Sequence, residues 1–140
     1  MLLRGGADPN GIVADYETPL LAAINQNNLP LVTTLIAAGA GANLSIIPGI
    51  KRTPLQLAAE KGNMDIIKIL LAHGADVNAS PYDRWGATAL QFAAIGGYLG
   101  LANLLLERGA DANTSPAKID GRTALERAAE HGRIDSFSFF

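Results

Sequence analysis

Three carboxylates that recur at one repeated position are the first side chains that could do chemistry. Asp8, Asp76 and Asp111 each follow a Gly-Ala pair. Carboxylates can hold a metal ion or act as an acid or base, but only where their side chains converge on one point. Aspartates at one position of successive repeats lie along a stack rather than around one point, so we expect them to stabilise turns and helix caps instead. We therefore expect no catalytic, cofactor-binding or metal-binding residue among them.

The two histidines are the other candidates for acid–base chemistry. His131 stands beside Glu130 and near Asp135, and with these carboxylates it could form an acid–base pair. His73 lies far from them in the sequence and does not occupy the equivalent position of the repeat described below. A lone surface histidine usually has no such role. No phosphate-binding loop, dinucleotide fingerprint or nucleophile elbow is present in the sequence. The expectation is a protein that is not an enzyme and needs no cofactor.

The composition narrows the possible partners. The chain has 140 residues, which suggests one domain, and 49% of them are hydrophobic, which is ample for a core. The formal net charge is −2, whereas a nucleic-acid binder usually shows a basic excess or stripe. The absence of cysteine excludes a disulfide framework and thiolate metal sites, and it fits a reducing compartment. Binding to nucleic acid is therefore not expected.

Nothing in the sequence indicates secretion or membrane insertion. The first residues lack the basic segment and long apolar run of a signal peptide. No charged residue occurs from Thr18 to Ile50, but Asn, Pro and Gly interrupt that stretch. No block of about 20 apolar residues remains to span a membrane. We expect an intracellular, cytoplasmic protein, and we interpret the sequons at Asn43, Asn78 and Asn113 as recurring turn asparagines rather than glycosylation sites.

An internal repeat of 35 residues must position these side chains. Threonines at 18, 53, 88 and 123 each begin a Thr-Pro-Leu or Thr-Ala-Leu segment. A second series of Gly-Ala segments agrees with the first and begins at Gly6, Gly39, Gly74 and Gly109. Two independent motifs in one register indicate a repeat architecture.

Each repeat predicts two short helices. Thr is a good N-cap, and Pro54 fits the first helical position because its missing N–H is not needed there. Alanine pairs such as Ala58-Ala59 let helices approach closely. Glycine ends the first helix because it adopts the left-handed conformation without strain, and Asn27 takes that place in the first full repeat. A second helix follows, with apolar residues at helical spacing.

Two segments of the chain closely resemble ankyrin repeats: TPLQLAAEKGNMDIIKILLAHGADVNA and TALQFAAIGGYLGLANLLLERGADANT. The usual ankyrin period is about 33 residues. The two extra residues fall in the loop that forms a β-hairpin finger in this family, and this longer finger resembles the ankyrin arrays of filamentous-fungal proteins. The resemblance implies an all-α ankyrin-repeat solenoid of helix-turn-helix units with β-hairpin fingers, which acts as a protein-binding scaffold.

The resemblance also implies a single ankyrin-repeat domain over residues 1–140. Its parts are a remnant over 1–10, full repeats over 11–43, 44–78 and 79–113, and a truncated repeat over 114–140. Where the family often has a histidine after Thr-Pro-Leu, this chain has Leu21, Gln56, Gln91 and Glu126. The glutamines could still hydrogen-bond between neighbouring loops, but Leu21 could not.

The fingers and the ends of the first helices are the candidate binding surface. Both line the concave face in the resembling family, and the helix-end pairs differ in every repeat while the framework recurs. Trp and Tyr are enriched among binding hot spots, and exposed apolar clusters mark interaction sites. The predicted partner-binding residues are Asn25, Gln26, Ile46, Ile47, Ile50, Arg52, Glu60, Lys61, Tyr82, Trp85, Ile95, Glu130 and His131.

Several alternatives remain open at this point. The finger residues could fold back and pack the longer loops, and the helix-end variation could be neutral drift. A small-ligand or enzymatic site could use a groove pocket near Trp85 and His131. A third possibility is self-association through uncapped ends, because Phe137, Phe139 and Phe140 are apolar where terminal repeats normally carry polar caps.

Overall fold

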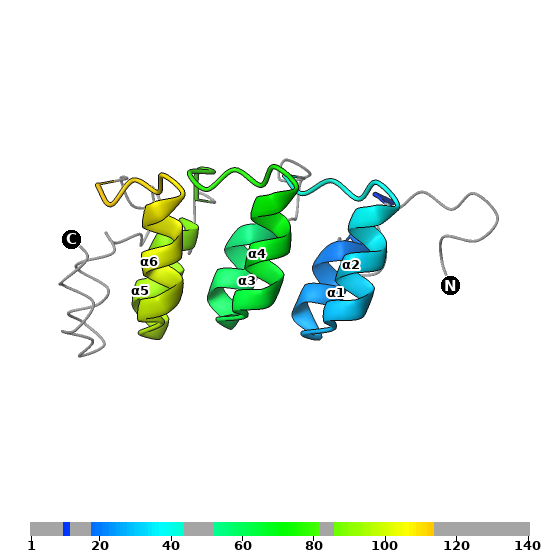
Figure 1. Cartoon of the computed structure of the whole chain (residues 1–140), viewed down its shortest axis with the longest axis horizontal. Helices are drawn as coiled ribbons and strands as arrows, with labels where there is room; N and C mark the ends of the chain where they lie inside the picture. Colours follow the sequence, from blue (N-terminus) through cyan, green and yellow to red (C-terminus); the bar gives the residue numbers. More distant parts are fainter. Residues whose placement is uncertain (1–9, 12–17, 44–51, 82–85, 114–140) are drawn as a thin grey trace. The chain divides into compact units, whose positions relative to one another are not determined.

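The computed structural model describes residues 10–11, 18–43, 52–81 and 86–113. These ranges contain six α-helices and no strand (Figure 1). None of these helices is long and apolar enough to span a lipid bilayer. The predicted β-hairpin fingers fall mostly outside the described residues. The chain divides into two compact units, Met1–Ala75 and Asp76–Phe140, and each has its own helix packing.

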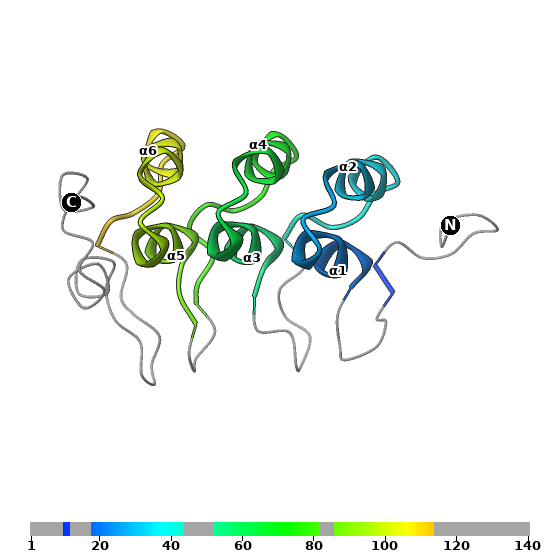
Figure 2. The ribbon, with the colours of Figure 1, turned by 90° about the horizontal axis from the view of Figure 1, so that it is seen from below.

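The first unit contains two helix pairs. These are α1 (Pro19–Asn25) with α2 (Leu29–Ala37), and α3 (Pro54–Lys61) with α4 (Met64–Ala72). Helix α1 packs against both α2 and α3, and α3 packs against α4. Figure 2 shows α1 and α3 side by side in one row and α2 and α4 in a second row. The predicted repeat of two-helix units is therefore present in this unit.

The second unit contains one described helix pair, α5 (Ala89–Gly96) and α6 (Leu99–Glu107), which pack against each other. Its first helix begins and ends at the residues that the 35-residue period predicts. Thr88 is the N-cap of α5 and Gly97 is its C-cap, as Thr53 and Gly62 are for α3.

The first helices begin at buried threonines. The Oγ1 of Thr18 accepts a hydrogen bond from Leu21 N at 3.2 Å. In the same way, Thr53 Oγ1 accepts from Gln56 N and Thr88 Oγ1 accepts from Gln91 N. In α3 and α5 a glutamine completes a capping box, because its Oε1 accepts from the backbone N–H of the capping threonine. The capping-box bond joins two residues of the same repeat, whereas the sequence suggested that these glutamines could bond between neighbouring loops. Leu21 stands in the glutamine's place in α1 and cannot accept such a bond.

A left-handed residue ends each of the three described first helices. Gly62 and Gly97 have φ of 73° and 72°, and Asn27 has φ of 53°. Residues with a Cβ rarely adopt this region, and asparagine is the usual exception. The structure therefore confirms that Asn27 takes the place of glycine.

The core is built from the predicted alanine pairs and one face of each second helix. Ala59 is 0% exposed and Ala94 is 1% exposed. Small side chains at these positions let neighbouring helices approach closely. The buried residues of the second helices are Val32, Leu35, Ile36, Ile66, Ile67, Leu70, Leu101, Ala102 and Leu105.

Candidate functional site

Six of the predicted partner-binding residues lie in the part of the chain that the structure describes: Asn25, Gln26, Arg52, Glu60, Lys61 and Ile95. The remaining seven lie outside the described residues: Ile46, Ile47, Ile50, Tyr82, Trp85, Glu130 and His131. The proposed pocket near Trp85 and His131, and the apolar residues at the end of the chain, are outside it as well. The site can therefore be built from the ends of the first helices.

In the first unit, the ends of α1 and α3 present polar side chains to solvent. Asn25 and Gln26 are exposed at the end of α1, and Glu60 and Lys61 are exposed at the end of α3. Because α1 packs against α3 and the two pairs occupy the same repeat position, they stand on neighbouring helices in one register. The structure thus brings four of the predicted residues onto one row of helices.

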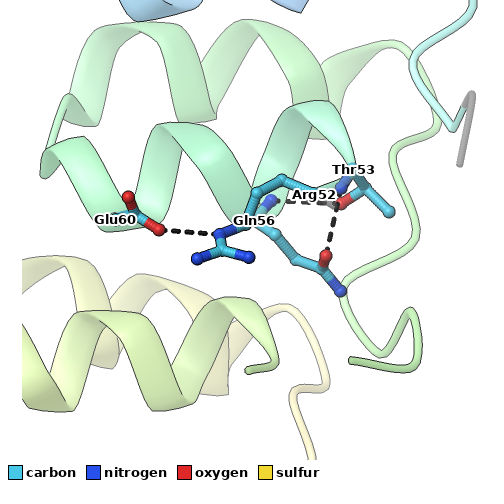
Figure 3. A network of polar contacts seen from close by, with 4 residues as sticks. All are labelled: Arg52, Thr53, Gln56 and Glu60. Atoms are coloured by element: carbon cyan, nitrogen blue, oxygen red, sulfur yellow. Dashed lines mark hydrogen bonds and ion pairs between the residues drawn. The ribbon is translucent and has the colours of Figure 1, made fainter. Parts of the chain in front are cut away.

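An ion pair runs along α3 on this surface. Arg52 Nε donates to Glu60 Oε2 at 2.7 Å, as Figure 3 shows beside the capping box. Arg52 directly precedes the capping residue Thr53, so its side chain reaches along the helix to the last turn. The two side chains are 22% and 40% exposed, and a pair this open to solvent contributes little to stability. Its main effect is to hold the Arg52 guanidinium over α3.

This surface has two cationic side chains, Arg52 and Lys61. Arg52 pairs with Glu60, whereas Lys61 makes no ion pair with another described residue. Beside it, Arg52 and Glu60 neutralise each other. The end of α3 therefore presents one uncompensated positive charge, which could be paired by an acidic group of a partner.

In the second unit the same repeat positions are apolar. Ile95 is half-buried, and Gly96 takes the place that Lys61 has in α3. Tyr98 follows, and its side chain is 38% exposed. Tyr98 was not among the residues predicted from the sequence. The available signal was its position, where the two preceding repeats have Asn28 and Asn63 and a capping side chain is expected.

The asparagines that precede the fingers connect successive repeats. Asn43 Nδ2 donates to Gly74 O at 2.7 Å, and Asn78 Nδ2 donates to Gly109 O at 2.9 Å. Asn78 Oδ1 also accepts from the backbone N–H of Asp111 at 2.8 Å. The side-chain amides of Asn43 and Asn78 are thus hydrogen-bonded within the fold, which supports the interpretation that these two asparagines are structural rather than glycosylated.

The recurring aspartates stabilise turns, as predicted. Asp76 Oδ1 accepts from Asn78 N at 2.9 Å, and Asp111 Oδ1 accepts from Asn113 N at 2.8 Å. These are the short bonds of Asx turns. Within the described ranges, no three His, Cys, Asp or Glu side chains gather where they could hold a metal ion. Asp8 lies outside those ranges.

Comparison with known families agrees with this architecture. A family profile described as Ankyrin repeats (3 copies) matches residues 1–81, 20–116 and 79–140. Since the matches together cover the chain, it belongs to the ankyrin-repeat family. Ankyrin repeats generally bind other proteins and are typically scaffolds without enzymatic activity. No curated protein matches this chain at a significant level.

Proposed function

We propose that the chain binds a partner protein on the fingers and on the ends of its first helices. The observation that carries this proposal is variation on a constant frame. The left-handed caps Gly62 and Gly97 agree within one or two degrees, with φ of 73° and 72° and ψ of 22° and 23°. The outward residues on the same helices differ completely in chemistry. A tailored contact surface has this arrangement, because its backbone is fixed while its side chains vary.

The mechanism is presentation of side chains by a preformed surface. At the ends of α3 and α5, the left-handed Gly62 and Gly97 fix the backbone, with the bonds from Asn63 N to Ala58 O and from Tyr98 N to Ala93 O. A partner that docks there orders few groups, so little of its interaction free energy is lost as conformational entropy. The proposed contact residues include Asn25, Gln26, Glu60 and Lys61 in the first unit.

The repeat boundaries 11–43, 44–78 and 79–113 are part of this proposal. Each range holds one of the three described helix pairs, which supports it. Deleting residues 44–78 removes one whole period and should leave a chain that melts cooperatively. Deleting residues 44–71, which is out of register, should abolish the cooperative melt followed by circular dichroism. Equal melting of both deletions would contradict the boundaries.

The first test uses two matched charge reversals. Lys61→Glu changes the end of α3, and Lys68→Glu changes an exposed position of α4 on the other row of helices. A partner recovered by pull-down with mass spectrometry would be titrated against both variants by calorimetry. We expect Lys61→Glu to weaken binding severalfold, with a salt dependence that Lys68→Glu lacks. A larger effect from Lys68→Glu would place the partner on the opposite helices.

The second test concerns the finger residue Trp85, which lies outside the described residues. If Trp85 anchors the partner, Trp85→Ala should weaken binding at least roughly thirtyfold and leave the helical content intact. If it packs the finger instead, the variant should melt at a lower temperature and keep its affinity once folding is corrected for. Calorimetry and thermal melts on the same variant distinguish the two roles.

A further inference from the structure

The turn between α5 and α6 departs from the pattern of the other two turns. Asn28 and Asn63 cap α2 and α4, accepting from Leu31 N at 3.2 Å and from Ile66 N at 3.1 Å. Tyr98 occupies the same position at α6 and makes no side-chain cap hydrogen bond. Asparagine is among the best N-cap residues and tyrosine is not. The third repeat therefore lacks a stabilising bond that the other two have.

The helix before this turn departs from the pattern as well. Gly96 is the last residue of α5, where α3 has Lys61. Glycine in a helix makes the helix less stable than other residues do, except proline, because glycine loses more backbone entropy on folding. A Cβ at this position would meet the Tyr98 ring, at 2.6 Å from Cδ2 and 2.8 Å from Cζ. Gly96 therefore leaves the space that the ring occupies.

The two departures together produce an exposed aromatic ring. Tyr98 is 38% exposed and is the exposed large hydrophobic residue of the described part of the chain. Its ring neither caps a helix nor is buried in the core. Sites where local rules are broken without a gain in stability are expected to be functional or strained, and Tyr98 is a candidate for the first.

The two described helices of the second unit, which flank this ring, carry no charge before the last residue of α6. No Asp, Glu, Lys or Arg occurs from Gly86 to Leu106, which includes all of α5 and α6 up to its last residue. Ile95 and Gly96 stand where α3 has Glu60 and Lys61. A charged group of a partner would lose hydration against these two helices without gaining an opposite charge from them. An apolar group would lose nothing and would cover exposed ring surface.

We propose that Ile95, Gly96 and Tyr98, here called the Tyr98 patch, dock an uncharged segment of the partner protein. An aliphatic side chain of that segment covers the Tyr98 ring. This inference rests on the proposed function and specifies the chemistry of the partner at one part of its surface. The first unit, with Lys61 exposed, makes a polar contact instead.

The test separates binding from folding through Tyr98→Asn. This substitution restores the asparagine cap of the other repeats, so it should raise the Tm by roughly 2–6 °C or leave it unchanged. The probe is a phage library of random dodecapeptides selected on the wild-type protein, with the best binders synthesised and titrated. We expect them to contain an uncharged, aliphatic segment and to bind Tyr98→Asn about tenfold or more weakly. Gly96→Ala, which displaces the ring without removing it, should weaken binding to a smaller degree.

Four results would overturn the inference. Two of them concern the variant itself: the peptides bind Tyr98→Asn with unchanged affinity, or that variant has a lower Tm. The third is that the selected binders contact the protein with a charged segment. The fourth is Tyr98-dependent self-association in sedimentation, which would make the occupant a second copy of the chain. Peptides that respond to Lys61→Glu and not to Tyr98→Asn would refute this inference and leave the proposed function standing. A library without any binder would count against both.

Discussion

Helices α3 and α5 share one frame in two different units of the molecule. Both start at a buried threonine whose partner glutamine closes a capping box, with Thr53 N donating to Gln56 at 3.0 Å and Thr88 N donating to Gln91 at 2.9 Å. Both end at a left-handed glycine. Interior positions are constrained because each side chain must fit its neighbours at high packing density.

The residues around the ends of the same two helices have little in common. The ion pair of Arg52 and Glu60 beside α3 has no counterpart beside α5, where the equivalent residues are the buried Ala87 and the half-buried Ile95. A capping asparagine after α3 is replaced by the exposed ring of Tyr98 after α5. The comparison shows that the frame sets the backbone and that the outward residues set what the backbone presents. The following predictions test that division.

Removing a core leucine should have the largest effect, and the effect should be equal in the two helices. Leu55 and Leu90 are both 1% exposed and lie one period apart. Leu55→Ala and Leu90→Ala should each lower the free energy of unfolding by about 2–5 kcal/mol, because each leaves a cavity. Urea unfolding measures both values. A difference between them as large as either value would mean that the two frames are not equivalent.

Enlarging the alanine pair should be the next most damaging change. Ala59 and Ala94 are 0% and 1% exposed. Ala59→Leu and Ala94→Leu should each cost about 1–3 kcal/mol, because the added carbons force helices apart. The half-buried Ala22 of α1 offers a control, and Ala22→Leu should cost less. An unchanged Tm for Ala94→Leu would contradict the assigned register.

Removing the caps should have a smaller effect. Thr53→Ala and Thr88→Ala delete the hydroxyls that accept from Gln56 N at 3.1 Å and from Gln91 N at 3.2 Å. Each substitution should cost about 1 kcal/mol, measured by thermal or denaturant unfolding. Serine at either position keeps the hydroxyl and should recover most of the loss. A serine variant as unstable as the alanine variant would show that the threonine methyl group, rather than the cap, is responsible.

The ion pair should have the smallest effect, and it should be confined to α3. A double-mutant cycle with Arg52→Ala and Glu60→Ala should give a coupling free energy of about 0.2–1 kcal/mol that decreases with added salt. Ile95→Glu places a carboxylate at the equivalent position of α5, where Ala87 offers no cation. No comparable salt dependence is expected there. Equal salt dependence of the two carboxylates would show that Arg52 is not the cause.

Local sequence signals were enough to predict the helices and their ends. The 35-residue spacing of Thr18, Thr53 and Thr88 predicts where each first helix begins, and the structure confirms all three caps. The left-handed conformation of Asn27 was predicted in the same way. These features depend on residues within one turn of helix, so a short stretch of sequence contains the information. Gln56 belongs to a recognisable capping pattern as well, although from the sequence it was considered only for a possible hydrogen bond between neighbouring loops.

Only the tertiary structure could decide which distant groups meet and which side chains stay in solvent. Asn43 donates to a carbonyl 31 residues away, at Gly74, and no local pattern names that acceptor. The same limit applies to Tyr98, because a tyrosine after a glycine pair can be buried or exposed. Its ring lies over Gly96 and remains 38% exposed. Burial depends on how neighbouring helices pack, and that packing brings together residues far apart in the chain.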